Sequence, residues 1–166
     1  NHGRRVVVTG LGAITPVGNE APAMWQTLLA GKSGTGRIAC FDASTYTSQV
    51  DAEVKGFDPA QYLNAKEIKR TERFVQFAIA ASRQAISDAA FKIEAEDPYR
   101  CGVVIGTGIG SMHLIEHQHD VLRNRGVNKL SPFMIPMLIC TMAPGHTAMD
   151  VGFKGPNFCT TTACAS

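Results

Sequence analysis

The last ten residues of the chain place one cysteine where the backbone is expected to turn sharply. Residues 157–162 are rich in β-branched and aromatic side chains and follow the turn sequence Gly155-Pro156, so they are predicted to form a strand. Small residues, Ala163 and Ala165, flank Cys164. A nucleophile on a tight strand-to-helix turn needs small neighbours, because nothing bulky fits beside the projecting side chain. The pattern therefore predicts an α/β fold with Cys164 as candidate nucleophile, whereas a cysteine out of context is usually a buried structural thiol.

Strand and helix patterns alternate along the rest of the chain. Strands are predicted at 5–9 and 101–105, and helices at about 21–30, from 111 to near 126, and at about 142–150. A basic helical turn from Ala65 is expected to lead into a longer helix that carries residues 74–89. A loop-rich stretch at 32–57 has room for a small hairpin, and prolines are expected to confine 131–138 to short turns. The alternation implies a mixed, partly parallel sheet with helices packed against it.

Several local signals refine the predicted helices. Asn19 and Ser111 are candidate N-caps, and Gly31 is a candidate helix end. Pro144 fits a helix only in its first turn, which puts the cap near Thr141. One stripe at helical spacing is expected to form core, and it comprises Phe74, Phe77, Ala78, Ala81, Ala85 and Ala89.

Composition excludes several classes of protein. With 166 residues, 45% hydrophobic and 18% charged, the chain is expected to fold as one domain with a core. It has no apolar stretch of about 18 residues and no secretory signal pattern, so we expect a cytoplasmic protein without membrane contact. The odd number of cysteines, 5, argues against a disulfide framework, and the net charge of +2 is too small to indicate nucleic-acid binding.

Four motifs together resemble a known family. They are the opening Arg5-Val-Val-Val-Thr-Gly-Leu-Gly, Ser131-Pro132-Phe133, Gly155-Pro156-Asn157 and Thr162-Ala163-Cys164-Ala165. They are similar to the elongating β-ketoacyl-acyl carrier protein synthases of the thiolase superfamily, and most similar to the synthase II type of bacterial fatty acid synthesis. The resemblance implies a thiolase-like fold, of which residues 1–166 would be an incomplete N-terminal half that stops directly after the nucleophile turn.

The resemblance also implies an acyltransferase activity. In this family the cysteine at the position of Cys164 takes an acyl chain from acyl carrier protein. It then gives the chain to a carbanion made by decarboxylating malonyl-acyl carrier protein, which yields 3-oxoacyl-acyl carrier protein. The family is homodimeric and needs no cofactor or metal. Its catalytic histidines and lysine belong to a later segment, so no histidine of this chain receives a role and residues 1–166 alone are expected to be inactive.

The acyl-binding positions of the family fall on two parts of the chain. By resemblance, Ile109 lies at the floor of the acyl channel, where a bulky side chain gates the entry of long chains. Phe133 and Met134 match acyl-pocket positions, and Met134 would reach across the dimer interface. A flexible methionine suits chains of varied length. Ordinary core packing is the alternative for Ile109 and Met134.

The basic residues form one informative cluster. Lys66, Lys69, Arg70 and Arg73 recur at i, i+3, i+4 and i+7, so on one helix they would share a face. By resemblance Lys66, Lys69 and Arg70 match positions that bind the acidic helix of acyl carrier protein, and Lys129 matches another basic position of the family. Arg73 joins the expected docking surface through the shared helix face. Several exposed cations would steer association with an acidic partner and make it sensitive to salt. The alternative is an ordinary solvated helix face.

Two other kinds of site are weaker hypotheses. Glycine patterns at 10–12 and 106–110 follow predicted strands, as in dinucleotide-binding proteins, but both depart from the G-x-G-x-x-G spacing. Close backbone packing is the competing explanation for the second pattern. His113 and His117 lie at i, i+4 around Glu116, but no third metal ligand is evident.

Two alternatives remain for the function. A polyketide-type ketosynthase would carry the same nucleophile motif. A noncatalytic partner subunit of such an enzyme is the second alternative, and the presence of Cys164 argues against it, because those subunits typically lose the nucleophile.

Overall fold

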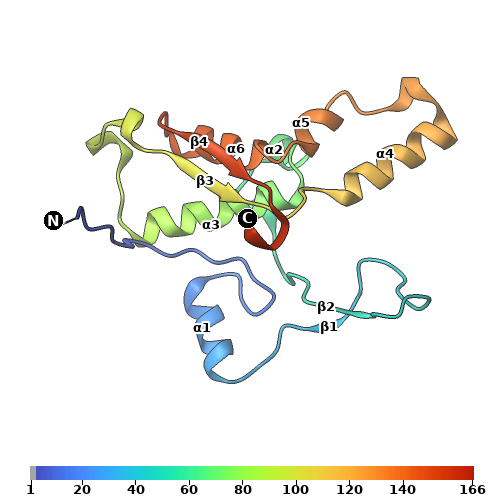
Figure 1. The fold of residues 1–166 in the computed structure, drawn as a ribbon, viewed down its shortest axis with the longest axis horizontal. Helices are drawn as coiled ribbons and strands as arrows, with labels where there is room; N and C mark the ends of the chain where they lie inside the picture. The colour runs from blue at the N-terminus through green and yellow to red at the C-terminus, as the bar shows by residue number, and fades with distance from the viewer. Residues whose placement is uncertain (1–2) are drawn as a thin grey trace. The chain divides into compact units, whose positions relative to one another are not determined.

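A computed structural model describes residues 3–166, and Figure 1 labels its helices and strands. The chain divides into two compact units. Unit 1 runs to Asp58 and resumes over Arg83–Phe91, and unit 2 comprises Pro59–Ser82 and Lys92–Ser166. Helix α3 (Arg73–Asp88) contributes residues to both units.

A parallel pair of strands lies at the centre of unit 2. Strand β3 (Val103–Gly106) pairs with β4 (Asn157–Thr160), with Val103 opposite Asn157 and Gly106 opposite Thr160 (Figure 1). Helix α6 (Met142–Val151) packs against both strands. The parallel pairing confirms the partly parallel α/β arrangement that the sequence predicts.

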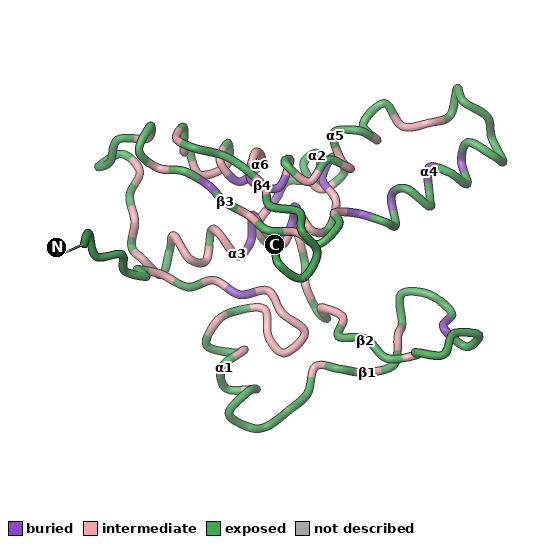
Figure 2. Tube along the Cα trace, viewed as in Figure 1, coloured by how far each residue is buried: buried purple, intermediate pink, exposed green. Residues whose placement is uncertain are grey.

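The core of unit 2 joins α3 to α6. Its buried residues are Leu63, Val75, Ile79 and Ala143. The stripe predicted as core is confirmed only in part, because its members are half-buried and two of them, Phe74 and Ala78, pack against the buried cluster. The stripe comprises Phe74, Phe77, Ala78, Ala81, Ala85 and Ala89. The buried residues of α3 are Val75, Gln76, Ile79 and Ala80, and Figure 2 shows the burial along the chain. The Phe77 ring centroid lies 4.8 Å from the Arg73 guanidinium carbon.

Two helices between the strands show how prolines are accommodated. Helix α5 (Met134–Leu138) corrects the prediction of turns only at 131–138. Pro136 is its third residue, where an N–H would have no partner within the helix. Pro144 likewise occupies the third position of α6, and Thr141 is the N-cap as expected.

Helix α4 (Met112–Arg125) confirms the predicted start and stop signals. The Ser111 hydroxyl accepts a hydrogen bond from the Leu114 N–H at 3.2 Å, and Gly126 ends the helix with a φ of 84°. Short helical turns complete unit 2, namely α2 (Ala65–Ile68) and 3₁₀ turns at Pro59–Gln61, Ile93–Ala95, Pro98–Arg100, Val127–Lys129 and Ala163–Ala165. No helix in residues 3–166 is long and apolar enough to cross a membrane.

The described residues of unit 1 include helix α1, the last residues of α3 and the expected small hairpin. Helix α1 spans Ala21–Leu29, and strands β1 (Gly36–Arg37) and β2 (Val50–Asp51) pair antiparallel. Gly31 follows the helix with a φ of 63°. The prediction of Asn19 as N-cap is wrong: Glu20 takes that position, and the Asn19 side-chain amide donates to the Lys55 carbonyl at 2.9 Å.

The strand predicted at 5–9 does not form. No described residue before Thr15 has regular secondary structure, and Val6, Val7 and Val8 are 93%, 72% and 81% exposed. Just beyond this run, the N–H groups of Leu11 and Ala13 donate to the side chains of Asp88 and Gln84, each at 2.9 Å. These bonds hold the residues after the run against α3, and neither described sheet includes residues 5–9.

Candidate functional site

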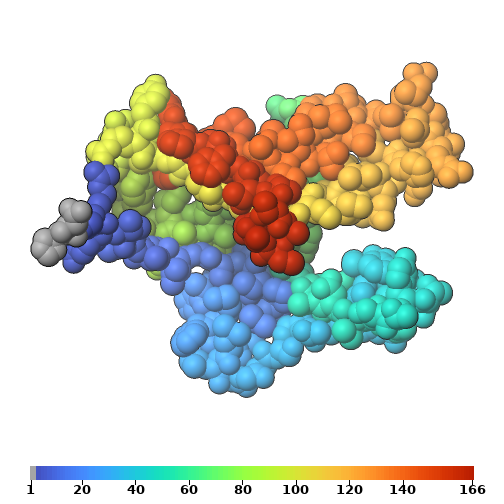
Figure 3. Space-filling view, viewed as in Figure 1, coloured from blue at the N-terminus to red at the C-terminus, as the bar shows by residue number. Residues whose placement is uncertain are grey.

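Cys164 lies on a tight turn directly after strand β4. Ala163 has a φ of 54°, which is rare for a residue other than glycine, and Ala163–Ala165 forms a single 3₁₀ turn. The left-handed conformation costs a non-glycine residue roughly 1 to 2 kcal/mol, least for a short side chain. Cys164 is exposed, and the turn lies at the molecular surface at the red end of the chain in Figure 3. The geometry is the tight turn with small neighbours that the sequence predicts.

Ser166 fastens this turn to the residues that follow β3. Its hydroxyl accepts from the Thr162 N–H at 2.7 Å and donates to the Thr107 carbonyl at 3.1 Å. A Cβ on Gly106 would lie 2.5 Å from the carbonyl carbon of Ser166. Only glycine therefore permits this close approach, which confirms close packing as the role of that glycine.

The glycine loop, residues 107–110, carries Ile109. The Gly110 N–H donates to the Thr107 hydroxyl at 3.2 Å, and Gly110 has a φ of 86°. A Cβ on Gly110 would lie 3.0 Å from the Cys140 sulfur, so the loop contacts both the Cys164 turn and the residues after α5. The Ile109 side chain is 64% exposed, and its place at a channel floor stays a prediction.

Phe133 and Met134 lie at the start of helix α5. The Phe133 ring is exposed, and the Arg70 guanidinium carbon lies 4.7 Å from its centroid. This distance is typical of a cation–π contact. The structure thus brings a predicted carrier-docking residue, Arg70, onto a predicted acyl-binding residue, Phe133.

The basic segment, residues 66–73, starts in a short helical turn that leads to the longer helix α3, as predicted, but its four cations do not lie on one helix. Helix α2 ends at Ile68, Lys69 and Arg70 lie in a turn, and α3 begins at Arg73. The cations of this segment remain exposed, as does Lys129 in its own 3₁₀ turn. The prediction that these cations share one helix face is therefore wrong, although all of them are exposed.

Side-chain hydrogen bonds explain where α2 begins and ends. Asn64 and Glu67 form a capping box at its start. At its end, the Thr71 hydroxyl donates to the Glu67 carbonyl at 2.7 Å. The amide of buried Gln76 donates to the carbonyls of Ile68 and Thr71 at 3.3 and 2.9 Å. Carbonyls that would have continued the helix are satisfied by side chains instead.

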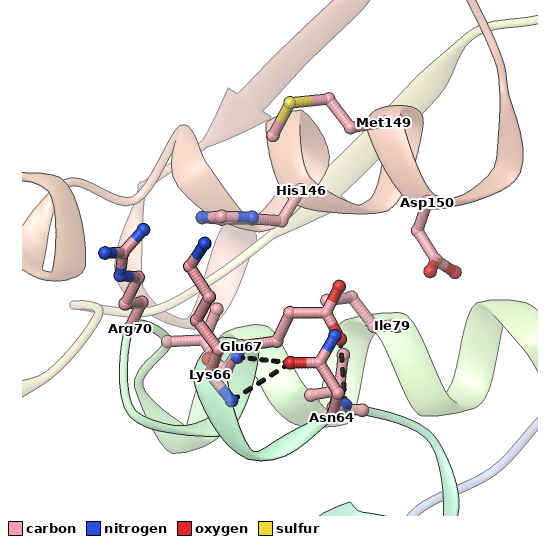
Figure 4. A pocket seen from close by; sticks show the side chains of 10 residues that line it. Asn64, Lys66, Glu67, Arg70, Ile79, His146, Met149 and Asp150 are labelled. Atoms are coloured by element: carbon pink, nitrogen blue, oxygen red, sulfur yellow. Dashed lines mark hydrogen bonds between the residues drawn. The ribbon is translucent and has the colours of Figure 1, made fainter.

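A cavity of about 420 Å³ lies beside the basic segment within unit 2. Figure 4 shows Lys66 pointing from α2 toward His146 on α6. The polar and charged residues that line the cavity are Asn64, Lys66, Glu67, Arg70, Thr71, His146 and Asp150. The apolar lining residues are Leu63, Ile79 and Met149. Two predicted docking residues, Lys66 and Arg70, line the cavity, whereas Lys69, Arg73 and Lys129 do not.

His146 is a cavity residue to which the sequence reasoning assigned no role. Burial lowers its pKa, and the nearby Glu67 carboxylate partly opposes that effect. The sequence contains one signal for it, because His146, Met149 and Asp150 follow the i, i+3, i+4 spacing of one helix face. Burial favours the neutral imidazole, which can accept or donate a hydrogen bond in the cavity without adding a charge.

Other cysteines and histidines make local contacts of their own. In unit 1 a hydrogen bond to the Glu53 carboxylate raises the pKa of the Cys40 thiol. On α4 the His113 and His117 rings stack with centroids 6.3 Å apart. No group of three histidine, cysteine or acidic side chains positioned to hold a metal occurs within residues 3–166.

Comparison with known proteins identifies what this arrangement is similar to. Residues 3–166 match the family described as Beta-ketoacyl synthase, N-terminal domain. Over 163 residues, 98% of the chain, the sequence is 52% identical to 3-oxoacyl-[acyl-carrier-protein] synthase 2 of Synechocystis sp.. The matched region is 39% of that relative, so the chain spans about two fifths of its length.

Solved structures with the same fold are ketosynthases. The ishigamide ketosynthase/chain length factor superposes with a TM-score of 0.85 at 25% identity, covering 96% of this chain and 40% of that one. A type II polyketide ketosynthase in complex with its acyl carrier protein has a TM-score of 0.76 at 24% identity, covering 95% of this chain and 42% of its own. These matches confirm the predicted thiolase-like fold. At 24% identity, the second match supports the fold and nothing further.

Proposed function

Because the chain belongs to the β-ketoacyl synthase family through its N-terminal domain, we propose that it supplies the acyl-accepting cysteine of a fatty-acid condensing enzyme. Residues 1–166 are then the N-terminal part of the ketosynthase domain. The observation that carries this proposal is the exposed Cys164 on its left-handed turn, fastened to the glycine loop by Ser166. The 52% identity to 3-oxoacyl-[acyl-carrier-protein] synthase 2 of Synechocystis sp. supports a condensation reaction.

The proposed reaction begins with transfer of an acyl chain to Cys164. Its thiolate attacks the carbonyl carbon of an acyl-acyl carrier protein thioester, a new C–S bond forms, and the carrier's thiol leaves. The backbone N–H of Cys164 serves as one donor to the developing oxyanion. In the second step malonyl-acyl carrier protein loses CO₂, and the resulting carbanion attacks the acyl carbonyl. The Cys164 thiolate leaves, and 3-oxoacyl-acyl carrier protein is released without any cofactor.

Acyl and carrier binding follow from the same arrangement. Ile109, Phe133 and Met134 are the proposed acyl-chain contacts. Lys66, Lys69, Arg70, Arg73 and Lys129 are the proposed docking residues for acyl carrier protein. Their exposure supports this role, because an acidic partner can reach them and long-range attraction accelerates association. A cytoplasmic homodimer completes the proposal, by analogy with the reaction class.

Identity distinguishes the fatty-acid function from a polyketide ketosynthase. The fatty-acid relative shares 52% of residues with this chain, whereas the ishigamide ketosynthase/chain length factor shares 25%. A noncatalytic subunit would not need a cysteine on a turn with this conformation. We therefore keep fatty-acid condensation as the proposed activity.

Acylation mapping tests the nucleophile. The full-length enzyme that contains these residues is incubated with dodecanoyl-acyl carrier protein and digested, and the peptides are weighed by mass spectrometry. We expect one dodecanoyl group on the peptide that contains Cys164, and none in the Cys164→Ala variant. The matched control is Cys159→Ala, because Cys159 lies on β4 only a few residues away. Acylation that survives Cys164→Ala but disappears with Cys159→Ala would refute the assignment.

A further inference from the structure

One hydrogen bond joins segments that are 39 residues apart in the sequence. The Ser111 hydroxyl donates to the Glu72 carboxylate at 2.5 Å. Ser111 is only 8% exposed, so water competes little for this bond. Such charge-assisted bonds are shorter and stronger than those between neutral groups.

Each partner stands at the start of a helix. The backbone carbonyl of Glu72 accepts from the N–H groups of Val75 and Gln76 and so begins α3. The Ser111 hydroxyl oxygen accepts from the Leu114 N–H and so begins α4. A hydroxyl has one proton and two lone pairs, so Ser111 caps α4 and bonds to Glu72 at the same time.

The two residues also border the two surfaces that the proposed function assigns. Glu72 lies within the basic segment, between Arg70 and Arg73, and Ser111 directly follows the glycine loop that carries Ile109. The other end of that loop is held by the bond from Ser166 to the Thr107 carbonyl. The loop is therefore fixed at one end to the Cys164 turn and at the other to the basic segment.

We propose that Glu72 and Ser111 are positioning residues that hold Ile109 in place and thereby set the enzyme's selectivity for acyl-chain length. The inference rests on the proposed function, because it concerns the acyl chain transferred to Cys164. Glu72 acts through the loop rather than by touching the acyl chain. When the bond is lost, Ile109 is held less firmly and obstructs long chains less.

Glu72 is the better residue to vary, because its side chain can be changed while both helix starts remain. Glu72→Ala removes the carboxylate but leaves the backbone carbonyl that begins α3 and the hydroxyl that caps α4. Glu72→Gln keeps an oxygen that can accept from Ser111 and should rescue the wild-type behaviour. Ser111→Ala is less informative, since it removes the cap and the bond together.

The test measures acylation of Cys164 in the full-length enzyme with hexanoyl- and tetradecanoyl-acyl carrier protein. For Glu72→Ala we expect the kcat/KM ratio to shift about tenfold toward the long chain, as the loss of a hydrogen bond to a charged group implies. In an Ile109→Gly background the same substitution should no longer shift the ratio, because the two residues act through one element. The exposed carboxylate on α4 provides a control, and Glu116→Ala should leave the ratio unchanged.

The outcomes separate this inference from the proposed function. If the wild-type enzyme accepts neither acyl chain, the proposed function fails. If it accepts both chains and Glu72→Ala alters them equally, Glu72 is merely structural and the inference is overturned. A shift that persists in the Ile109→Gly background would also overturn it. Should Glu72→Ala unfold, Glu72→Met replaces it, because Met fills a similar volume and offers no carboxylate to Ser111. A ratio shift with Glu72→Met that disappears with Ile109→Gly supports the inference, and an unchanged ratio with Glu72→Met overturns it.

Discussion

The N-terminal valine run and strand β3 are both rich in β-branched residues, but only β3 forms a strand. Residues 5–9 and 103–106 are both short and rich in β-branched residues. The second pairs with β4 along its length, and Val103 is 9% exposed. The first has no strand partner in unit 1, and Val6 is 93% exposed. β-Branched composition thus makes a segment able to form a strand, but a hydrogen-bonding neighbour decides whether it does.

The largest expected effect comes from the glycine that ends the partnered strand. In Gly106→Ala the new Cβ would lie 2.5 Å from the Ser166 backbone, so the Cys164 turn must move. A displacement of about 1 Å at a reacting group costs about a hundredfold in rate, and overpacking costs roughly 1 to 3 kcal/mol of stability. Acyl-transfer kinetics and chemical denaturation of the full-length enzyme measure the two effects.

Gly145→Ala is the matched control for this substitution. A Cβ on Gly145 meets nothing within 4 Å, and Gly145 lies in helix α6, where alanine is favoured. We expect acylation within about twofold of wild type, with unchanged or slightly raised stability. If Gly106→Ala behaves like Gly145→Ala, the close contact with Ser166 does not hold the turn.

A second experiment places the same substitution in the two valine segments. Val103→Thr puts a hydroxyl at a buried position without an assured partner, which costs roughly 1 to 3 kcal/mol. Val7→Thr exchanges an exposed side chain and should change stability by less than about 0.5 kcal/mol. Urea denaturation of both variants gives the difference directly. Equal destabilisation would mean that Val7 is buried in the protein as it exists in solution.

The smallest expected effect is a pH dependence that comes from His146. Burial lowers its folded-state pKa below the ordinary value near 6.5, so around and below that pH the unfolded chain binds more protons than the folded one. The stability that depends on neutral His146 is therefore fully present above about pH 6.5 and is lost as pH falls toward the folded pKa.

His146→Gln should remove this dependence and leave a flatter stability curve between about pH 5 and 7. Urea denaturation at several pH values measures it, with His119→Gln on the exposed face of α4 as the control. A curve equally steep in His146→Gln and wild type would assign the dependence to another group.

Local patterns predicted the parts of the fold that depend on neighbouring residues in the sequence. The small residues around Cys164 predicted its turn, and Ser111 and Gly126 predicted both ends of α4. The prolines of α5 and α6 show the limit of local patterns. Pro144 lies in the first turn of α6 as predicted, but Pro136 does not prevent a helix, because it lies in the first turn of α5.

Features that depend on distant side chains were not accessible from the sequence. Helical spacing predicted one basic face over residues 66–73, but buried Gln76 binds the carbonyls that would have continued α2. The inward face of α3 depends on Ala143, which is far away in the chain. The place of His146 in the cavity depends in the same way on α2 lying opposite α6.

The contact between Arg70 and Phe133 restricts where the guanidinium can lie. The guanidinium carbon lies 4.7 Å from the ring centroid, which limits the positions that the guanidinium can take. An arginine held in this way can offer a carboxylate two parallel hydrogen bonds along a defined line of approach. A lysine at the same position would keep the attraction but not the angle. Arg70 can therefore favour one direction of approach for an acidic surface.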